Sequence, residues 1–189
     1  AREVPFLSTA AMIDCSYLLM FRSLSACRMY DKQPWYRKIG IRSRLWIRTL
    51  RMRYWAKYNP TNFSQKYHLL AAEHSRILKK YRKAEKHYLK AIDASLVAGY
   101  QHETAVIYTC LANMYKDSHK MRLSAYAIQD AIKVYRSWGA HPIADQLEEQ
   151  FHDILFQYGG DSAAVGTRAY YLKLSSRILK TTRTETSML

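Results

Sequence analysis

Residues spaced by forty positions repeat the same pattern of small and apolar side chains, and this repeat restricts the fold more than any other feature. One set lies on a single helical face and comprises Ala84, Tyr88, Ala91, Ile92 and Ser95. Forty residues later the equivalent positions hold Ser124, Ile128, Ala131, Ile132 and Tyr135. The helix before each set obeys the same shift, with Tyr67, Leu70, Ala71 and Ala72 corresponding to Ile107, Cys110, Leu111 and Ala112. The sequence therefore predicts two similar helical hairpins in succession.

Proline, glycine and asparagine mark where these helices begin and end. Asn59-Pro60, followed by Thr61 and Asn62, predicts the end of one helix and the N-cap of the next, and Gly99 predicts the end of a later helix. The predicted helices of the repeated hairpins cover residues 62–78, 82–97, 102–116 and 120–137. An upstream pair is predicted at 6–30 and 35–57. Trp138-Gly139-Ala140 precedes a helix from Pro142 through Phe156, and Gly159-Gly160-Asp161 precedes a last helix near 164–180 with a frayed tail at 181–189.

Small residues recur where the helices of a hairpin have to approach closely, namely at Ala72 and Ala112 and at Ala84 and Ser124. This arrangement is typical of tetratricopeptide repeats, whose period is about 34 residues. We therefore expect an all-α fold of antiparallel helical hairpins stacked as a TPR-like α-solenoid. Residues 1–158 would form the array, with about three helix pairs and a following helix. Residues 159–189 would form the C-terminal helix and tail.

The chain is strongly basic, and the excess charge is concentrated in one stretch. Thirty Lys and Arg against fifteen Asp and Glu give a net charge of +15 among 189 residues. Between Lys32 and Ala72 there are ten basic residues and no acidic one. Polyanions and acidic protein surfaces are therefore plausible partners.

Four arginines in this stretch are the candidate contact residues. Arg37, Arg44, Arg48 and Arg51 follow helical spacing, and Trp35, Trp46, Tyr54 and Trp55 are interleaved with them. Arginines can bind phosphate backbones while aromatic rings stack on bases, but the same rings fit helix packing and the same charges fit an acidic protein. A solvated face, a contact with protein and a nucleic-acid interface on residues 32–66 all remain open.

Patterns that carry catalysis or metal binding are missing from the sequence. There is no phosphate-binding glycine loop and no nucleophile elbow. His102-Glu103 begins like a zinc-protease helix, but the required second histidine is replaced by Val106. We therefore predict no catalytic, cofactor-binding or metal-binding residues.

Cysteine usage and hydropathy bear on the compartment. Cys15, Cys27 and Cys110 show no metal-ligand spacing, which favours free thiols in a reducing cytoplasm. The apolar run from Val4 to Phe21 is interrupted by Asp14 and lacks signal-peptide flanks, so a buried helix is expected rather than a membrane span.

The run Trp55-Ala56-Lys57-Tyr58-Asn59-Pro60-Thr61-Asn62-Phe63, with Lys66-Tyr67 and Ala72-Glu73 after it, resembles the helical repeat region of large signalling ATPases. Tyr135-Arg136-Ser137-Trp138-Gly139-Ala140 is similar to the last repeat of that family, and the resemblance extends from about Phe6 to Phe151. Such proteins join a serine/threonine-kinase-like domain, a switch ATPase, a tetratricopeptide-like array and often a GAF domain with a histidine kinase. The sequence departs from the family pattern in two places. Lys79-Lys80-Tyr81 and Asp117-Ser118-His119 replace the glycine expected between paired helices. The lysine and valine usual after Trp-Gly-Ala are missing at Ile143 to Asp145.

The resemblance implies a regulatory or scaffolding segment without enzymatic activity, cut from a larger protein, as a chain starting at Ala1 also suggests. The expected partner is another protein or a neighbouring domain of the parent chain. The alternative is a nucleic-acid-binding module that uses residues 32–66.

Overall fold

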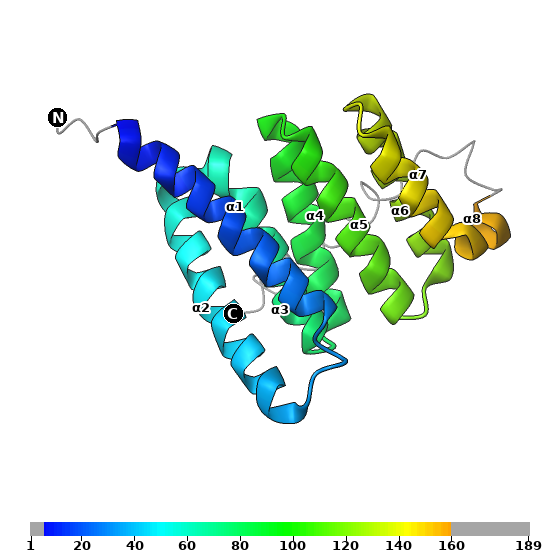
Figure 1. Cartoon of the computed structure of the whole chain (residues 1–189), viewed down its shortest axis with the longest axis horizontal. Coiled ribbons are helices and arrows are strands. Elements are labelled where there is room, and N and C mark those ends of the chain that lie inside the picture. The colour runs from blue at the N-terminus through cyan, green and yellow to red at the C-terminus, as the bar shows by residue number, and fades with distance from the viewer. Residues whose placement is uncertain (1–5, 160–189) are drawn as a thin grey trace, which may run out of the picture.

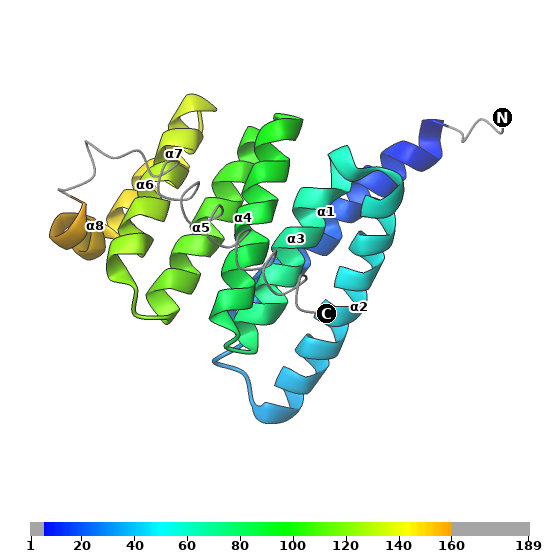
Figure 2. The ribbon, with the colours of Figure 1, turned by 180° about the vertical axis from the view of Figure 1, so that it is seen from behind.

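The computed structural model describes the backbone of residues 6–159 and the side chains of residues 15–159, and this part of the chain is helical without any strand. The helices are α1 (Phe6–Arg28), α2 (Trp35–Tyr58), α3 (Pro60–Ile77), α4 (Tyr81–Ala98), α5 (Gln101–Asp117), α6 (Met121–Ser137), α7 (His141–Gln150) and α8 (His152–Tyr158). Helices that follow one another in sequence pack side by side, most extensively α3 with α4 and α5 with α6. They form a row from α1 and α2 at one end to α7 and α8 at the other (Figures 1 and 2). The predicted C-terminal helix and tail lie outside the described residues.

The four turns from α3 to α7 repeat every twenty residues with the same geometry. In each turn one residue adopts a left-handed backbone conformation, with φ of 57° at Lys79, 75° at Gly99, 58° at His119 and 86° at Gly139. The next amide in each turn donates to the carbonyl oxygen five residues earlier, at 2.9 to 3.0 Å. This bonding caps the end of the preceding helix and reverses the chain. The repeat of forty residues is therefore present in the backbone as well as in the sequence.

Lys79 and His119 occupy positions that favour glycine, and this predicts a stabilising substitution. Lys79→Gly and His119→Gly should each raise the free energy of unfolding by about 0.5–1 kcal/mol, because a side chain disfavours positive φ more than glycine's chain entropy costs. Urea denaturation followed by circular dichroism measures the change. As the reciprocal control, Gly99→Ala and Gly139→Ala should destabilise by about 1 kcal/mol through φ alone, since an added Cβ would meet nothing within 4 Å. Destabilisation by both glycine substitutions would contradict the expectation.

The core forms along the faces that the repeat predicts. The small residues at equivalent positions are fully buried, namely Ala72, Ala84, Ala91, Ala112, Ser124 and Ala131. A large apolar cluster runs continuously from Met20 and Leu24 of α1 to Leu147 of α7 and to Phe151. A second, smaller cluster joins α1, α2 and α3 through Cys27, Leu45, Met52, Phe63 and Leu70, with Ile77 at its edge.

The helix predicted from Pro142 through Phe156 is interrupted at Phe151, so that prediction was wrong. Phe151 has φ −111° and ψ 16° and ends α7. Its ring is 2% exposed, and Lys116 lies over the ring at 5.4 Å from its centroid. Burying this ring turns the chain so that α8 packs against α6, as does α7. No described helix is long and apolar enough to cross a membrane.

Candidate functional site

The side of α2 that faces away from its buried residues carries an apolar stripe, and the predicted arginines lie beside this stripe. The buried side of this helix is narrow, consisting of Leu45, Thr49 and Met52. On the opposite side lie six large, exposed residues at helical spacing: Tyr36, Ile39, Ile47, Leu50, Tyr54 and Tyr58. We call these six residues the α2 outer face. Ile47 is 58% exposed and Leu50 is 42% exposed, so aliphatic surface faces solvent at its centre.

Basic residues border the α2 outer face. The helix carries eight basic residues and no acidic one, comprising Arg37, Lys38, Arg42, Arg44, Arg48, Arg51, Arg53 and Lys57. Among the side chains that the structure describes, none of these eight forms an ion pair with a carboxylate. The charges of α2 are therefore not neutralised by the described part of the chain.

The four predicted contact arginines lie along one border of the α2 outer face, about a quarter of a helical turn from it. Arg37, Arg44 and Arg51 are exposed. Arg37 donates to Gln33 at 3.5 Å, and the Nε of Arg44 donates to the carbonyl oxygen of Gly40 at 3.0 Å. Arg48 is half-buried and donates to Ser23 of α1 at 3.2 Å. Burial and the nearby Arg22 and Arg44 lower the pKa of Arg48.

The predicted basic surface at residues 32–66 is shorter than expected, because Lys66 is buried. Its Nζ lies 2.6 Å from Oε1 of Glu103, and the side chains are only 3% and 1% exposed. Lys66 also donates to the carbonyl oxygen of Asn62 at 3.0 Å and lies over the ring of Tyr17 at 4.4 Å. The exposed basic surface ends at Lys57.

The aromatic residues interleaved with the arginines divide between the surface and the interior. Trp35, Trp46 and Tyr54 are exposed, and Trp46 lies against His74 with ring centroids 5.6 Å apart. Trp55 is half-buried and packs on Phe63 at 5.6 Å. The helical spacing of the arginines was visible in the sequence, but the exposed aliphatic residues Ile39, Ile47 and Leu50 were missed as surface residues.

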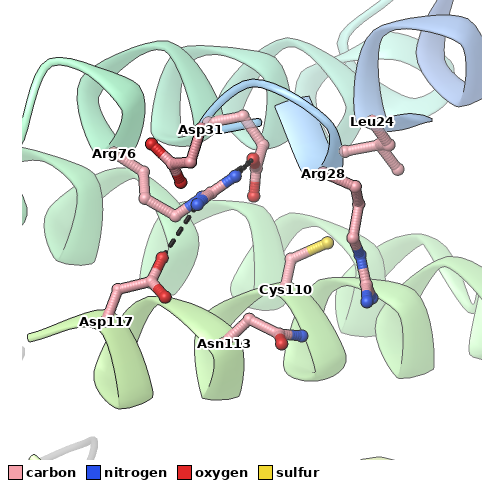
Figure 3. Close-up of a pocket in the computed structure, with 8 residues that line it drawn as sticks. Leu24, Arg28, Asp31, Arg76, Cys110, Asn113 and Asp117 are labelled. Carbon is pink, nitrogen blue, oxygen red and sulfur yellow. Dashed lines mark hydrogen bonds and ion pairs between the residues drawn. The ribbon is translucent and has the colours of Figure 1, made fainter. Parts of the chain in front are cut away.

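A pocket of about 130 Å³ lies where α1, α3 and α5 meet. It is lined by Leu24, Arg28, Asp31, Glu73, Arg76, Cys110, Asn113 and Asp117. Figure 3 shows Arg76 and Asp117 at one end of the pocket and Arg28 at the other, with Cys110 and Asn113 between them. These residues come from distant parts of the chain, and no sequence pattern marked them as a group.

The two arginines of the pocket differ in their partners. Arg76 donates to Glu73 at 2.9 and 3.0 Å, to Asp117 at 2.8 Å and to the carbonyl oxygen of Cys27 at 3.2 Å. Burial lowers its pKa, but the adjacent Glu73 carboxylate more than offsets this and raises it. No described side chain pairs with the Arg28 guanidinium. Arg28 is therefore the group in the pocket that is open to an anionic ligand.

The three cysteines do not form a reactive or metal-binding site in the described residues. Cys27 and Cys110 are buried, Cys15 is partly exposed, and all three are free thiols. Burial is the main cause that raises the pKa of Cys110 to about 12, so this thiol is not activated as a nucleophile. Among the described residues there is no group of three or more side chains positioned to hold a metal ion.

His68 of α3 and His87 of α4 form a contact that predicts a pH dependence of stability. Their Nδ1 atoms are 3.3 Å apart. Burial first, and then His87 and Lys90, lower the pKa of His68 from 6.5 to about 4. Burial and the nearby Lys83 and Lys90 also lower the pKa of His87. The folded pair is therefore neutral under conditions in which the unfolded chain begins to bind protons.

From this contact we expect the free energy of unfolding to fall as the pH is lowered from about 6.5 towards 4, because the unfolded state binds more protons across this window. After allowance for partial exposure, the loss due to His68 should be about 1–2 kcal/mol. Urea denaturation at several pH values measures it. His68→Gln should flatten the dependence, whereas His152→Gln should leave it unchanged, since His152 is 73% exposed. An unchanged slope in His68→Gln would show that other groups cause the dependence.

Comparisons of the chain with protein-family models, with curated proteins and with solved structures found no match. The candidate surfaces therefore rest on the chain's own residues.

Proposed function

We propose that this chain is a non-catalytic protein-interaction segment, a TPR-like array that receives a partner protein or a neighbouring domain. The observation that carries the proposal is the pocket between α1, α3 and α5, because it is shared by three helices that are not consecutive in sequence. A pocket shared by helices of successive pairs is what a stacked array would provide, and stacked repeats commonly present extended binding surfaces.

The charges at the pocket favour a particular kind of partner segment. Arg28 offers a guanidinium without a described partner, and Asn113 lies beside it in the lining. A carboxylate of the partner would form a charge-assisted hydrogen bond with Arg28. Asp31 and Asp117, which also line the pocket, would select against a uniformly acidic segment. We therefore propose a peptide with an isolated acidic side chain or a terminal carboxylate.

A peptide-display selection on the full chain tests this proposal. Peptides selected on the unmodified protein should contain a carboxylate whose removal weakens binding, and Arg28→Glu should weaken the same peptides at least about tenfold, since like charges then face each other. The matched control is Arg82→Glu, an exposed arginine on α4, which should have no effect. Peptides that bind equally well to the Arg28→Glu variant would refute the pocket as the docking site.

We further propose that the segment comes from a multidomain signalling ATPase or kinase, as its resemblance to the repeat region of that family implies. In such a protein the array would connect regulatory input to catalytic domains. The full-length gene product provides the test. A kinase or ATPase signature in the same reading frame would support the parentage, and a full-length product limited to helical repeats would refute it.

A further inference from the structure

The α2 outer face and the arginines beside it show two features that are each costly for a surface left in water. Six large apolar or aromatic side chains are exposed together along one helix, where scattered single residues would be ordinary. The pKa of Arg48 is lowered by its burial and also by repulsion from the nearby charges of Arg22 and Arg44. No described carboxylate relieves this crowding.

The order of side chains around α2 matches a helix lying in a membrane interface. The apolar stripe occupies the outermost line, and long basic side chains border it on both sides, Arg44 and Arg51 on one and Arg42 and Arg53 on the other. Such side chains can extend their charged ends to lipid phosphates while the stripe enters the acyl boundary. Tryptophan and tyrosine are favoured at this depth, and Trp35, Trp46, Tyr36, Tyr54 and Tyr58 supply them.

The position of α2 favours a deformable surface over a folded partner or a nucleic acid. It lies at one end of the row of helices and packs on α1 and α3 through its opposite side (Figure 2). The α2 outer face is therefore a ridge on a single helix. Nucleic acid would use the arginines and aromatic rings, but Ile39, Ile47 and Leu50 at the centre would remain unexplained.

We infer that the α2 outer face docks in the plane of an anionic phospholipid surface, with its aliphatic residues in the interface and the bordering arginines on the lipid phosphates. The attraction of each arginine to anionic headgroups adds to the burial of the stripe. This inference is independent of the proposed function, because it uses none of the residues that line the pocket.

Vesicle flotation with the full chain tests the inference. The protein should float with vesicles of phosphatidylcholine and phosphatidylserine at physiological salt, and far less with phosphatidylcholine alone. The triple variant Ile39→Ser, Ile47→Ser and Leu50→Ser should weaken partitioning at least about tenfold, because it removes the buried apolar area. Arg44→Gln with Arg51→Gln should weaken it by about tenfold and reduce its salt dependence.

Matched controls come from other exposed positions. Leu96→Ser with Val97→Ser removes exposed apolar residues from α4, and Arg82→Gln with Lys86→Gln removes two exposed charges from the same helix. Neither control should change flotation. Circular dichroism verifies that each variant keeps its helices.

Tryptophan quenching provides a measurement that does not depend on the apolar variant folding. Trp46 and Trp138 are both 50% exposed, but only Trp46 lies on α2. Brominated lipids should quench the fluorescence of the unmodified protein. Trp46→Phe should remove a larger part of this quenching than Trp138→Phe does.

Three results would overturn the inference. The first is a lack of binding to phosphatidylserine vesicles even at low salt. The second is vesicle binding that only the arginine variant weakens, with equal binding to RNA of similar charge, which would indicate a general polyanion site. The third is tight binding to an acidic amphipathic peptide, lost in the serine variant, without any vesicle binding, which would assign the surface to a protein partner.

Discussion

Replacing Lys66 by methionine should lower the free energy of unfolding by about 3–5 kcal/mol, the largest single effect we expect in this chain. The Lys66–Glu103 pair is 2.6 Å apart and almost completely buried. Lys66 provides the close countercharge of this carboxylate, since the Nε2 of His102 lies farther away, at 3.8 Å from Oε1. Methionine keeps much of the side-chain volume but leaves the charge of Glu103 uncompensated. Urea denaturation followed by circular dichroism measures the loss.

The double variant Lys66→Met with Glu103→Met separates the charge effect from packing. Removing both charges should restore most of the lost stability, because the cost arises from leaving one charge without its partner. Lys120→Met is the matched single control. Lys120 is 47% exposed, its Nζ lies 3.9 Å from Glu85, and Glu85 keeps a hydrogen bond from Tyr115 at 2.7 Å. A Lys66→Met loss no larger than that of Lys120→Met would show that the buried pair is energetically neutral.

Glu73→Gln should destabilise the protein by about 3 kcal/mol, because one carboxylate connects several helices. One Glu73 oxygen accepts from Arg76 and the other accepts from the fully buried Tyr88 of α4. Arg76 in turn reaches Asp117 of α5 and the end of α1 at Cys27. Glutamine can still accept from Tyr88, but it leaves the Arg76 charge with only the partly exposed Asp117. Thermal and urea unfolding measure the effect.

Glu148→Gln is the matched control for Glu73→Gln. It is the same substitution, but its arginine partner lies at the surface. Glu148 lies 2.8 Å from Arg136, and these side chains are 41% and 48% exposed. Its loss should cost less than about 0.5 kcal/mol because solvent screens the pair. Equal effects of Glu73→Gln and Glu148→Gln would mean that burial does not strengthen the Glu73 network.

Local signals predicted most helix boundaries to within about two residues, because helix starts and stops depend on neighbouring residues. Gly99 ends α4 in the left-handed conformation, as expected from its residue type. The N-cap of α3 is Asn59, which accepts from the amide of Asn62, so this helix begins at Pro60, two residues earlier than predicted. The break at Phe151 was missed, because it follows from burying that ring against α5 and not from a local turn signal. The glycine-free turns at Lys79 and His119 also keep the repeated geometry without a local signal for it.

The sequence predicted that the candidate arginines share one stripe of α2, but it did not predict what surrounds them. The spacing of Arg37, Arg44, Arg48 and Arg51 predicted a common stripe, and the structure places them on one border of the α2 outer face. Spacing alone could not decide which side of α2 faces its neighbours, since both sides carry large apolar residues. The pocket could not be predicted, because its lining comes from three helices up to 93 positions apart, from Leu24 to Asp117.

The sequence by itself determined the helices, their forty-residue repeat and the small residues that would be buried, because these depend on periodicity and local backbone preference. Only the tertiary structure decided which individual charges are buried and which remain exposed. Lys66 belongs to the basic run in sequence, but packing of α3 on α5 buries it against Glu103. The arginines of α2 belong to the same run and remain at the surface beside an exposed apolar stripe. The physical reason is that the energy of a charge depends on its burial and its partner, and residues far apart in the chain supply both.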